Sequence, residues 1–174
     1  MVKSLIDALK ECGAIKFGDF KLASGKKSRY YVDIKKASTN PVLLKLIACS
    51  ISEKMKLHSI HADYISGVAL GSVPIAVSVS LETGTPLLMI RKEAKDYGTK
   101  GQIVGDVIPG SNVVLVEDVT TTGGSVIKAI QALRDEGLMI RHVITVVDRE
   151  EGASESLICA EVELIPLVRM SELL

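Results

Sequence analysis

The chain has 174 residues, 47% of them hydrophobic, which is enough apolar material for one domain with its own core. Its 21 Lys and Arg residues balance its 21 Asp and Glu residues, so bulk charge argues against a protein that coats nucleic acid. No apolar run approaches the roughly 18 residues that a membrane span needs, and residues 1–12 mix charged with apolar side chains, unlike a signal peptide. We therefore expect one cytoplasmic domain over residues 1–174, with no nucleic-acid and no membrane partner.

The N-terminal part of the chain predicts two helices on either side of a β-rich segment. Residues 2–12 have apolar side chains at helical spacing, and Gly13 ends that pattern. Residues 18–36 are mixed and favour strands. The second helix begins at Asn40 and Pro41, because asparagine caps free N–H groups and proline suits the first helical position.

From residue 63 onward, apolar strands alternate with amphipathic helices. Strands are predicted over residues 63–68, 86–90, 113–116, 143–147 and 162–167, and helices over residues 72–81, 125–134 and 153–158. Continuous apolar strands that alternate with helices predict an α/β fold, a mostly parallel twisted sheet flanked by helices on both faces. Ligands of such sheets bind at the carboxyl ends of the strands, and the polar motifs of this chain follow those ends.

The strongest chemical signal follows the strand at residues 113–116. Glu117 and Asp118 come first, and residues 119–125 (Val-Thr-Thr-Thr-Gly-Gly-Ser) then open a helix. Free N–H groups at a helix start attract anions, glycines let a phosphate approach closely, and hydroxyls add donors. Two acids beside such a loop make sense if they hold ribose hydroxyls or face a bound cation. An ordinary turn with an acidic tip is the alternative, and a Walker loop is excluded because no Gly-Lys-Ser or Gly-Lys-Thr follows.

This segment resembles the signature with which type I phosphoribosyltransferases bind 5-phosphoribosyl 1-pyrophosphate (PRPP). The resemblance implies that Glu117 and Asp118 lie against the ribose hydroxyls and act in catalysis. It implies that the residues after them also bind PRPP: Val119, Thr120, Thr121, Thr122, Gly123, Gly124 and Ser125. It further implies the type I phosphoribosyltransferase fold, in which about residues 1–36 contribute to a small N-terminal hood over the base site.

The turn between the strand at residues 63–68 and the next helix resembles the pyrophosphate loop of the same family. The residues that the resemblance places there are Val68, Ala69, Leu70, Gly71 and Ser72. Their backbone N–H groups would contact the leaving pyrophosphate. Taken alone, a turn with glycines at residues 67 and 71 fits a packing role about as well.

A long polar stretch, residues 91–102, follows the strand at residues 86–90. It resembles the mobile catalytic loop of orotate phosphoribosyltransferases, which begins Arg-Lys-x-x-Lys, and Arg91, Lys92 and Lys95 match that pattern. The resemblance implies that these residues bind PRPP, that Lys95 stabilises charge on the departing pyrophosphate, and that the loop reaches into the other subunit of a homodimer. A solvated hairpin is the alternative.

Tyr97 departs from the family pattern, because the family usually has histidine two residues after the loop lysine. We expect its hydroxyl to bind PRPP by a hydrogen bond to the leaving pyrophosphate, without titrating near pH 7. An exposed, inert tyrosine is the alternative.

Two further segments resemble the base site of the family. Residues 24–28 match its Ser-Gly-x-x-Ser stretch, but Ala23 stands where bacterial members often have lysine, so that role is not transferred. Tyr30 and Tyr31, just beyond, fit core packing better than stacking on a base.

The turn at residues 148–152 (Asp-Arg-Glu-Glu-Gly) resembles the family's turn that begins Asp-Arg and continues to a glycine, which implies that Arg149 and Thr121 contact orotate. A guanidinium suits a flat carboxylated base because it can donate two parallel hydrogen bonds. From the sequence alone, Arg149 fits a surface ion pair with Glu150 or Glu151 equally well.

The resemblance implies transfer of the phosphoribosyl group of PRPP to orotate, giving orotidine 5'-phosphate and pyrophosphate in pyrimidine biosynthesis. Mg²⁺ is implied as cofactor, held mainly by PRPP oxygens and water rather than by protein ligands. One alternative is a phosphoribosyltransferase for another base such as adenine, against which the Arg-Lys-x-x-Lys and Asp-Arg motifs argue. The other is a regulator that senses PRPP while binding nucleic acid, against which the neutral net charge argues.

Overall fold

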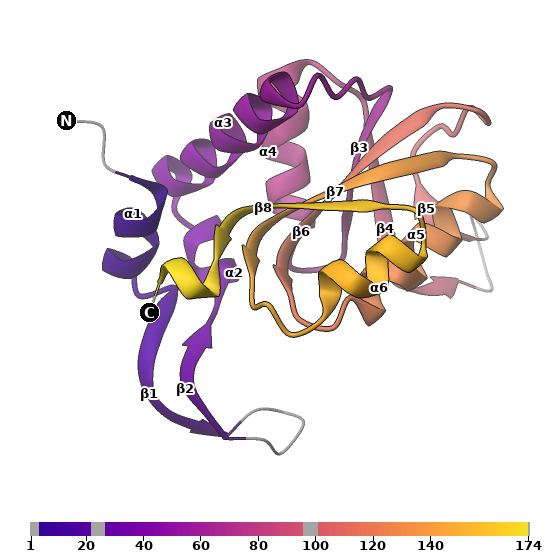
Figure 1. The fold of residues 1–174 in the computed structure, drawn as a ribbon. Helices are drawn as coiled ribbons and strands as arrows, with labels where there is room; N and C mark the ends of the chain where they lie inside the picture. The colour runs from indigo at the N-terminus through magenta and orange to yellow at the C-terminus, as the bar shows by residue number, and fades with distance from the viewer. Residues whose placement is uncertain (1–3, 22–26, 96–100, 174) are drawn as a thin grey trace.

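The centre of the protein is a six-stranded sheet in a computed structural model that describes residues 4–21, 27–95 and 101–173 (Figure 1). Its strands are β3 (Tyr64–Val68), β4 (Leu87–Lys95), β5 (Gly101–Val104), β6 (Asn112–Thr120), β7 (Met139–Asp148) and β8 (Glu163–Arg169). Their order is β5-β4-β3-β6-β7-β8, and the sheet is parallel except that β5 runs antiparallel to β4. The predicted α/β architecture is confirmed.

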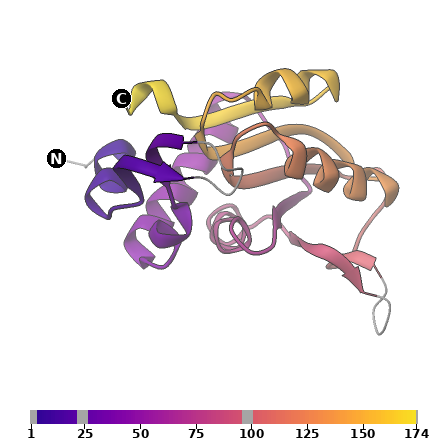
Figure 2. The same cartoon turned by 90° about the horizontal axis from the view of Figure 1, so that it is seen from below.

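Helices cover both faces of this sheet (Figure 2). α3 (Pro41–Leu57) and α4 (Val73–Thr83) lie on one face, and α5 (Gly124–Asp135) and α6 (Ala153–Cys159) lie on the other. Along β6, Val114 and Val116 belong to the first apolar core, while Val113 and Leu115 belong to the second. Successive side chains of a strand point to opposite faces, so a strand between two cores must be apolar throughout.

The start of α3 shows how local sequence sets an element. The Asn40 side chain accepts hydrogen bonds from the N–H groups of Val42 (3.0 Å) and Leu43 (3.3 Å), and Pro41 is the first helical residue. The predicted start is therefore confirmed, and the cap satisfies two of the free N–H groups of the first turn. No helix in the described ranges is long and apolar enough to cross a membrane.

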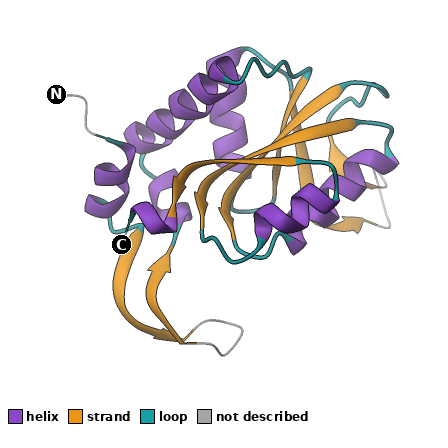
Figure 3. Ribbon diagram, in the orientation of Figure 1, coloured by secondary structure: helices purple, strands orange, loops and turns teal. Residues whose placement is uncertain are grey.

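The N-terminal segment forms a small unit beside the sheet (Figure 3), and its buried side chains join the first apolar core. It consists of α1 (Leu5–Glu11), the antiparallel strands β1 (Ile15–Lys21) and β2 (Lys27–Val32), and the short helix α2 (Ile34–Ser38). The β1–β2 hairpin extends from the end of the molecule at which β6 and β7 finish, next to the final 3₁₀ helix η1 (Met170–Glu172). Helix α2 is absent from the sequence prediction because its five residues are too few to show a helical period.

The strand predicted at residues 86–90 continues further than expected. β4 runs to Lys95 and pairs with β5, so the first part of the polar stretch is an antiparallel hairpin rather than a loop. Side chains bond to the backbone across it, because Gln102 donates to the Arg91 carbonyl at 2.9 Å and Arg91 donates to the Gly101 carbonyl at 3.3 Å. Apolar periodicity could not show a strand held by polar side chains.

Candidate active site

Three loops lie together at the carboxyl end of the parallel strands. They follow β3, β6 and β7, which are adjacent and parallel, so their carboxyl ends lie side by side. Among the described residues, those predicted to bind pyrophosphate, PRPP and orotate lie at or just after these three strand ends, or on β4 next to them.

The acidic pair lies at the end of β6. Glu117 is 6% exposed, and its Oε1 accepts the backbone N–H of Asp118 at 3.0 Å. Burial raises the pKa of Glu117 from 4.5 to about 8, and a side-chain interaction with Asp118 and the charge of Asp118 act in the same direction. The backbone N–H of Asp118 and the Ser72 hydroxyl oppose the rise. Glu117 is therefore largely protonated at neutral pH in the free protein and can donate a hydrogen bond.

The predicted pyrophosphate loop packs directly against Asp118. Any side chain added at Gly71 would collide with the Asp118 carboxylate, so glycine permits this approach without moving either the turn or the Asp118 side chain. The buried Ser72 hydroxyl accepts the Val68 N–H at 2.7 Å and closes the turn. Leu70, at the tip, is 77% exposed. The packing role and the ligand role proposed for this turn thus coincide, because the packing aligns its backbone with the acidic pair.

The loop after β6 is tied to the loop after β7. The Thr120 hydroxyl donates to Asp148 Oδ1 at 3.0 Å, and the N–H of Glu150 donates to the same oxygen at 3.1 Å. The N–H of Arg149 donates to the Thr120 carbonyl at 2.9 Å. These bonds hold the proposed PRPP and orotate residues in one fixed arrangement.

The remaining residues of the proposed PRPP loop form a turn that opens α5. Gly123 precedes the helix with φ of 84°, a left-handed conformation that favours glycine, and a backbone atom of Ala153 lies 3.4 Å from the place of any added Cβ. Thr122, Gly124 and Ser125 are exposed, and Thr121 is half-buried. The free N–H groups of the first helical turn therefore face solvent, as an anion-binding loop requires.

The Arg149 side chain is more buried than that of an arginine in an ordinary surface ion pair. Its side chain is 10% exposed, and Nη2 is 2.7 Å from Glu151 Oε1. Its Cζ lies over the Tyr30 ring, 5.0 Å from the centroid, and its Nε is buried with no acceptor among the described residues. Of the two partners left open by the sequence, Glu151 is the one found, whereas Glu150 accepts hydrogen bonds from the N–H and hydroxyl of Ser171.

The basic residues of the polar stretch are divided between the described and the other parts of the chain. Arg91 and Lys92 line a cavity of ≈ 400 Å³ together with Val68 and Ser125, which joins the basic strand to both anion loops. Lys95 ends β4, and Tyr97 lies outside the described residues.

Sequence reasoning missed Lys35. Its Nζ is 3.7 Å from Asp118 Oδ2 and 3.8 Å from Asp33 Oδ1, so a cation from α2 faces the acidic pair. No spacing rule connects residues this far apart in the chain. Only the return of the N-terminal unit to the ends of β6 and β7 brings them together.

Magnesium, the implied cofactor, requires oxygen ligands. Among the described residues, no group of three or more His, Cys, Asp or Glu side chains is arranged to hold a metal. Glu117 and Asp118 offer carboxylate oxygens at the strand end. Mg²⁺ commonly takes one or two carboxylates and completes its shell with water and substrate phosphates, so this pair fits a substrate-borne ion.

The chain is similar in sequence and in structure to one family of proteins. Residues 34–165 match the family described as "Phosphoribosyl transferase domain". The "Orotate phosphoribosyltransferase" of Methanosarcina mazei is 57% identical over 172 residues, which cover 99% of this chain and 91% of that protein. The crystal structure of orotate phosphoribosyltransferase from Aeropyrum pernix is 34% identical, with a TM-score of 0.88 over 98% of this chain and 96% of that one. That of Mycobacterium tuberculosis in complex with PRPP is 27% identical, with a TM-score of 0.81 over 97% and 96%. The chain therefore belongs to the orotate phosphoribosyltransferase family.

Proposed function

We propose that the protein transfers the phosphoribosyl group of PRPP to orotate, giving orotidine 5'-phosphate and pyrophosphate in pyrimidine biosynthesis. The observation that carries this proposal is that three different loops lie together at the carboxyl ends of β3, β6 and β7. The turn after β3 matches the pyrophosphate, the acidic pair and anion loop at the end of β6 match the ribose and its phosphate, and the enclosed guanidinium after β7 matches a carboxylated base.

PRPP would lie across the ends of β3 and β6. The N–H groups and hydroxyls of residues 120–125 would hold the 5-phosphate, and the turn at residues 68–72 would hold the pyrophosphate. Asp118 would accept a hydrogen bond from one ribose hydroxyl, and protonated Glu117 can donate to the other. The M. tuberculosis relative, solved with PRPP, supports this choice of ligand.

Magnesium would be bound mainly through PRPP oxygens and water, with Asp118 as the nearby carboxylate. When bound, the ion would neutralise charge on the pyrophosphate. Asp118 as a carboxylate and Glu117 as a carboxylic acid would orient the ribose.

The reaction would be a direct displacement. A ring nitrogen of orotate attacks C1 of the ribose as the bond from C1 to the pyrophosphate oxygen breaks, and the proton of that nitrogen passes to the departing pyrophosphate. No covalent enzyme intermediate forms. Arg149 and Thr121 would orient orotate, which brings the nitrogen into line with C1. Lys95, with Arg91 and Lys92 behind it, would stabilise the charge that gathers on the leaving group, assisted by the Tyr97 hydroxyl.

We further propose a homodimer in which the β4–β5 hairpin of one subunit completes the site of the other. The hairpin projects from the body of the protein, as Figure 2 shows, and its described strands carry Arg91 and Lys92. A basic arm at the edge of the sheet can reach a neighbour's phosphates more easily than a buried strand could.

The proposed function is tested by offering the purified protein PRPP and Mg²⁺ with orotate, adenine or uracil. We expect pyrophosphate release with orotate and none above background with the other two bases. Turnover with adenine instead would support the rival phosphoribosyltransferase. PRPP binding without turnover of any base, together with nucleic-acid binding, would support the regulator.

A further inference from the structure

The ion pair between Arg149 and Glu151 carries an inference about how the base is selected. Arg149 is the guanidinium proposed to bind the carboxylate of orotate, and the inference rests on that assignment. In the free protein its Nη2 is already 2.7 Å from a carboxylate oxygen of Glu151. The protein thus presents to Arg149 the same chemical group that the substrate would bring.

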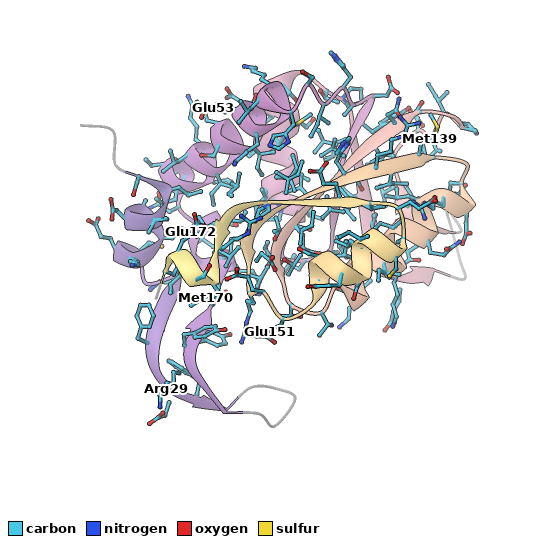
Figure 4. All side chains as sticks on the ribbon, in the orientation of Figure 1. Arg29, Glu53, Met139, Glu151, Met170 and Glu172 are labelled. Carbon is cyan, nitrogen blue, oxygen red and sulfur yellow. The ribbon has the colours of Figure 1, made fainter. Side chains whose placement is uncertain are left out.

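The pairing is unequal in the exposure of its two partners. The Arg149 side chain is 10% exposed, whereas the Glu151 side chain, labelled in Figure 4, is 38% exposed. The guanidinium also lies over the Tyr30 ring at 5.0 Å, and its backbone N–H is bonded to Thr120. Arg149 is therefore fixed by several contacts, while Glu151 can leave by rotating its side chain into solvent.

The pairing is also incomplete. Arg149 Nε is buried and has no acceptor in the described part of the chain. A carboxylate that binds a guanidinium in the bidentate way engages two nitrogens at once. An incoming carboxylate that takes Nε together with a neighbouring nitrogen would satisfy a donor that Glu151 leaves unpaired. Leaving a buried donor unpaired is costly, so this difference favours exchange.

We propose that Glu151 is a specificity-determining residue that acts as an internal competitor for Arg149. In the free protein it neutralises a nearly buried cation, and orotate binds by replacing the Glu151 carboxylate with its own. A base without a carboxylate, such as uracil, cannot make this replacement. It must either leave the pair in place, where Glu151 takes up the site, or separate it and leave a buried charge unpaired.

The test is the isosteric substitution Glu151→Gln, which removes the competing charge and keeps the size of the side chain. We expect the orotate KM to fall about threefold to tenfold, because orotate no longer displaces an anion. The PRPP KM and kcat should stay within about twofold of the parent values, since no proposed PRPP contact changes. Because one side chain is altered at constant size, far-ultraviolet circular dichroism should confirm an unchanged fold.

Two matched variants make the test specific. Glu155→Gln removes the same charge from an exposed position at the start of α6 and should leave the orotate KM unchanged. In an Arg149→Ala background, Glu151→Gln should have no further effect, because the competitor has nothing to compete for.

The outcomes separate this inference from the proposals on which it rests. An orotate KM that rises in Glu151→Gln would show that Glu151 supports Arg149 rather than competes for it, and an unchanged KM would show that the pair is irrelevant to base binding. Either result overturns the inference while orotate transfer by the parent protein stands. If Arg149→Ala alone leaves the orotate KM unchanged, the orotate contact proposed for Arg149 is wrong as well.

Discussion

Glu117 and Asp118 are neighbours on β6, but the fold gives them different surroundings. Glu117 is enclosed by the sheet and bonded to the backbone of Asp118, whereas Asp118 faces Gly71 on one side and Lys35 on the other. Asp118 is thus the member of the pair that adjoins both the proposed pyrophosphate loop and a cation. We expect it to carry the main contact with the ribose.

Asp118→Asn tests this role. The change keeps the size of the side chain and removes a charge-assisted hydrogen bond, an interaction worth roughly 1.5–3 kcal/mol. Orotate turnover should therefore fall about tenfold to a hundredfold, with an unchanged fold. Steady-state kinetics at saturating PRPP measure the effect, and turnover at the parent rate would show that the ribose lies elsewhere.

The raised pKa of Glu117 predicts how stability depends on pH. Between about pH 4.5 and pH 8 the folded protein keeps a proton on Glu117 that the unfolded chain has lost. The unfolded state then binds fewer protons, so this group lowers the free energy of unfolding as pH rises through that window, by up to about 1.4 kcal/mol per pH unit. Above pH 8 its contribution should level off.

Glu117→Gln removes this titration and should flatten the pH dependence of stability. Urea unfolding of parent and variant at pH 5, 6.5 and 8, without ligands, measures it. The variant should gain stability relative to the parent as the pH increases. Parallel curves for the two proteins would mean that Glu117 is ionised throughout the window.

At the scale of elements, the turn between β3 and α4 is held by its contact with the end of β6. Gly71→Ala should push the turn away from Asp118, because the new methyl group meets the carboxylate. Such overpacking costs about 1–3 kcal/mol, and both thermal stability and PRPP affinity should fall. Thermal melting and PRPP titration measure the two losses.

Gly124→Ala is the matched control for stability. Gly124 also lies outside the left-handed region, but the nearest atom to an added Cβ, Thr122 Oγ1, is 4.0 Å away. Alanine has a higher helix propensity than glycine, so the melting temperature of Gly124→Ala should not drop. Equal destabilisation of the two variants would show that the Asp118 contact has no special role.

The sequence predicted those helices and strands that are determined by neighbouring residues or by a regular spacing of apolar side chains. The start of α3 depends on Asn40 and Pro41 themselves, and β6 is apolar because both of its faces are covered. The extension of β4 to Lys95 was missed, since polar side chains bonded to the backbone hold it and leave no apolar period.

The proposed site divides in the same way. Residues 117–125 are contiguous and could be assigned from one motif, and the structure places them together at one strand end. Lys35 and the contact of Tyr30 with Arg149 arise from the N-terminal unit returning to the sheet edge. Pairings between distant segments leave no trace in the spacing of a single sequence.

At the scale of the whole molecule, a zero net charge coexists with a basic arm. Arg91 and Lys92 lie on one strand and line one cavity, so positive charge is concentrated there although the chain as a whole is neutral. The proposed exchange of this arm between subunits can be tested by complementation. Lys95→Ala and Asp118→Asn proteins should each keep at most about a tenth of the parent activity.

When the two variants are mixed so that their subunits exchange, activity should return. A hybrid dimer has one site with an intact arm and an intact acidic pair, so random exchange restores about a quarter of the sites. Mixing Asp118→Asn with Glu117→Gln is the control and should restore nothing, since every site is then damaged. Proven exchange with no recovery in the first mixture would place the arm in its own subunit's site.

The contact of Gly71 with Asp118 and the bond of Thr120 to Asp148 have an entropic consequence. Together they join the three loops into one rigid surface. The backbone of these loops loses its conformational freedom when the chain folds, at an entropic cost of about 1–2 kcal/mol per residue. Substrate binding therefore need not order the loops again, so the entropy lost on binding comes from the substrate and from the groups that close over it. If either contact were weakened, the loops would be partly disordered in the free protein and would become ordered only when substrate binds. The substrate affinity would then fall with rising temperature as the local stability of the loops falls.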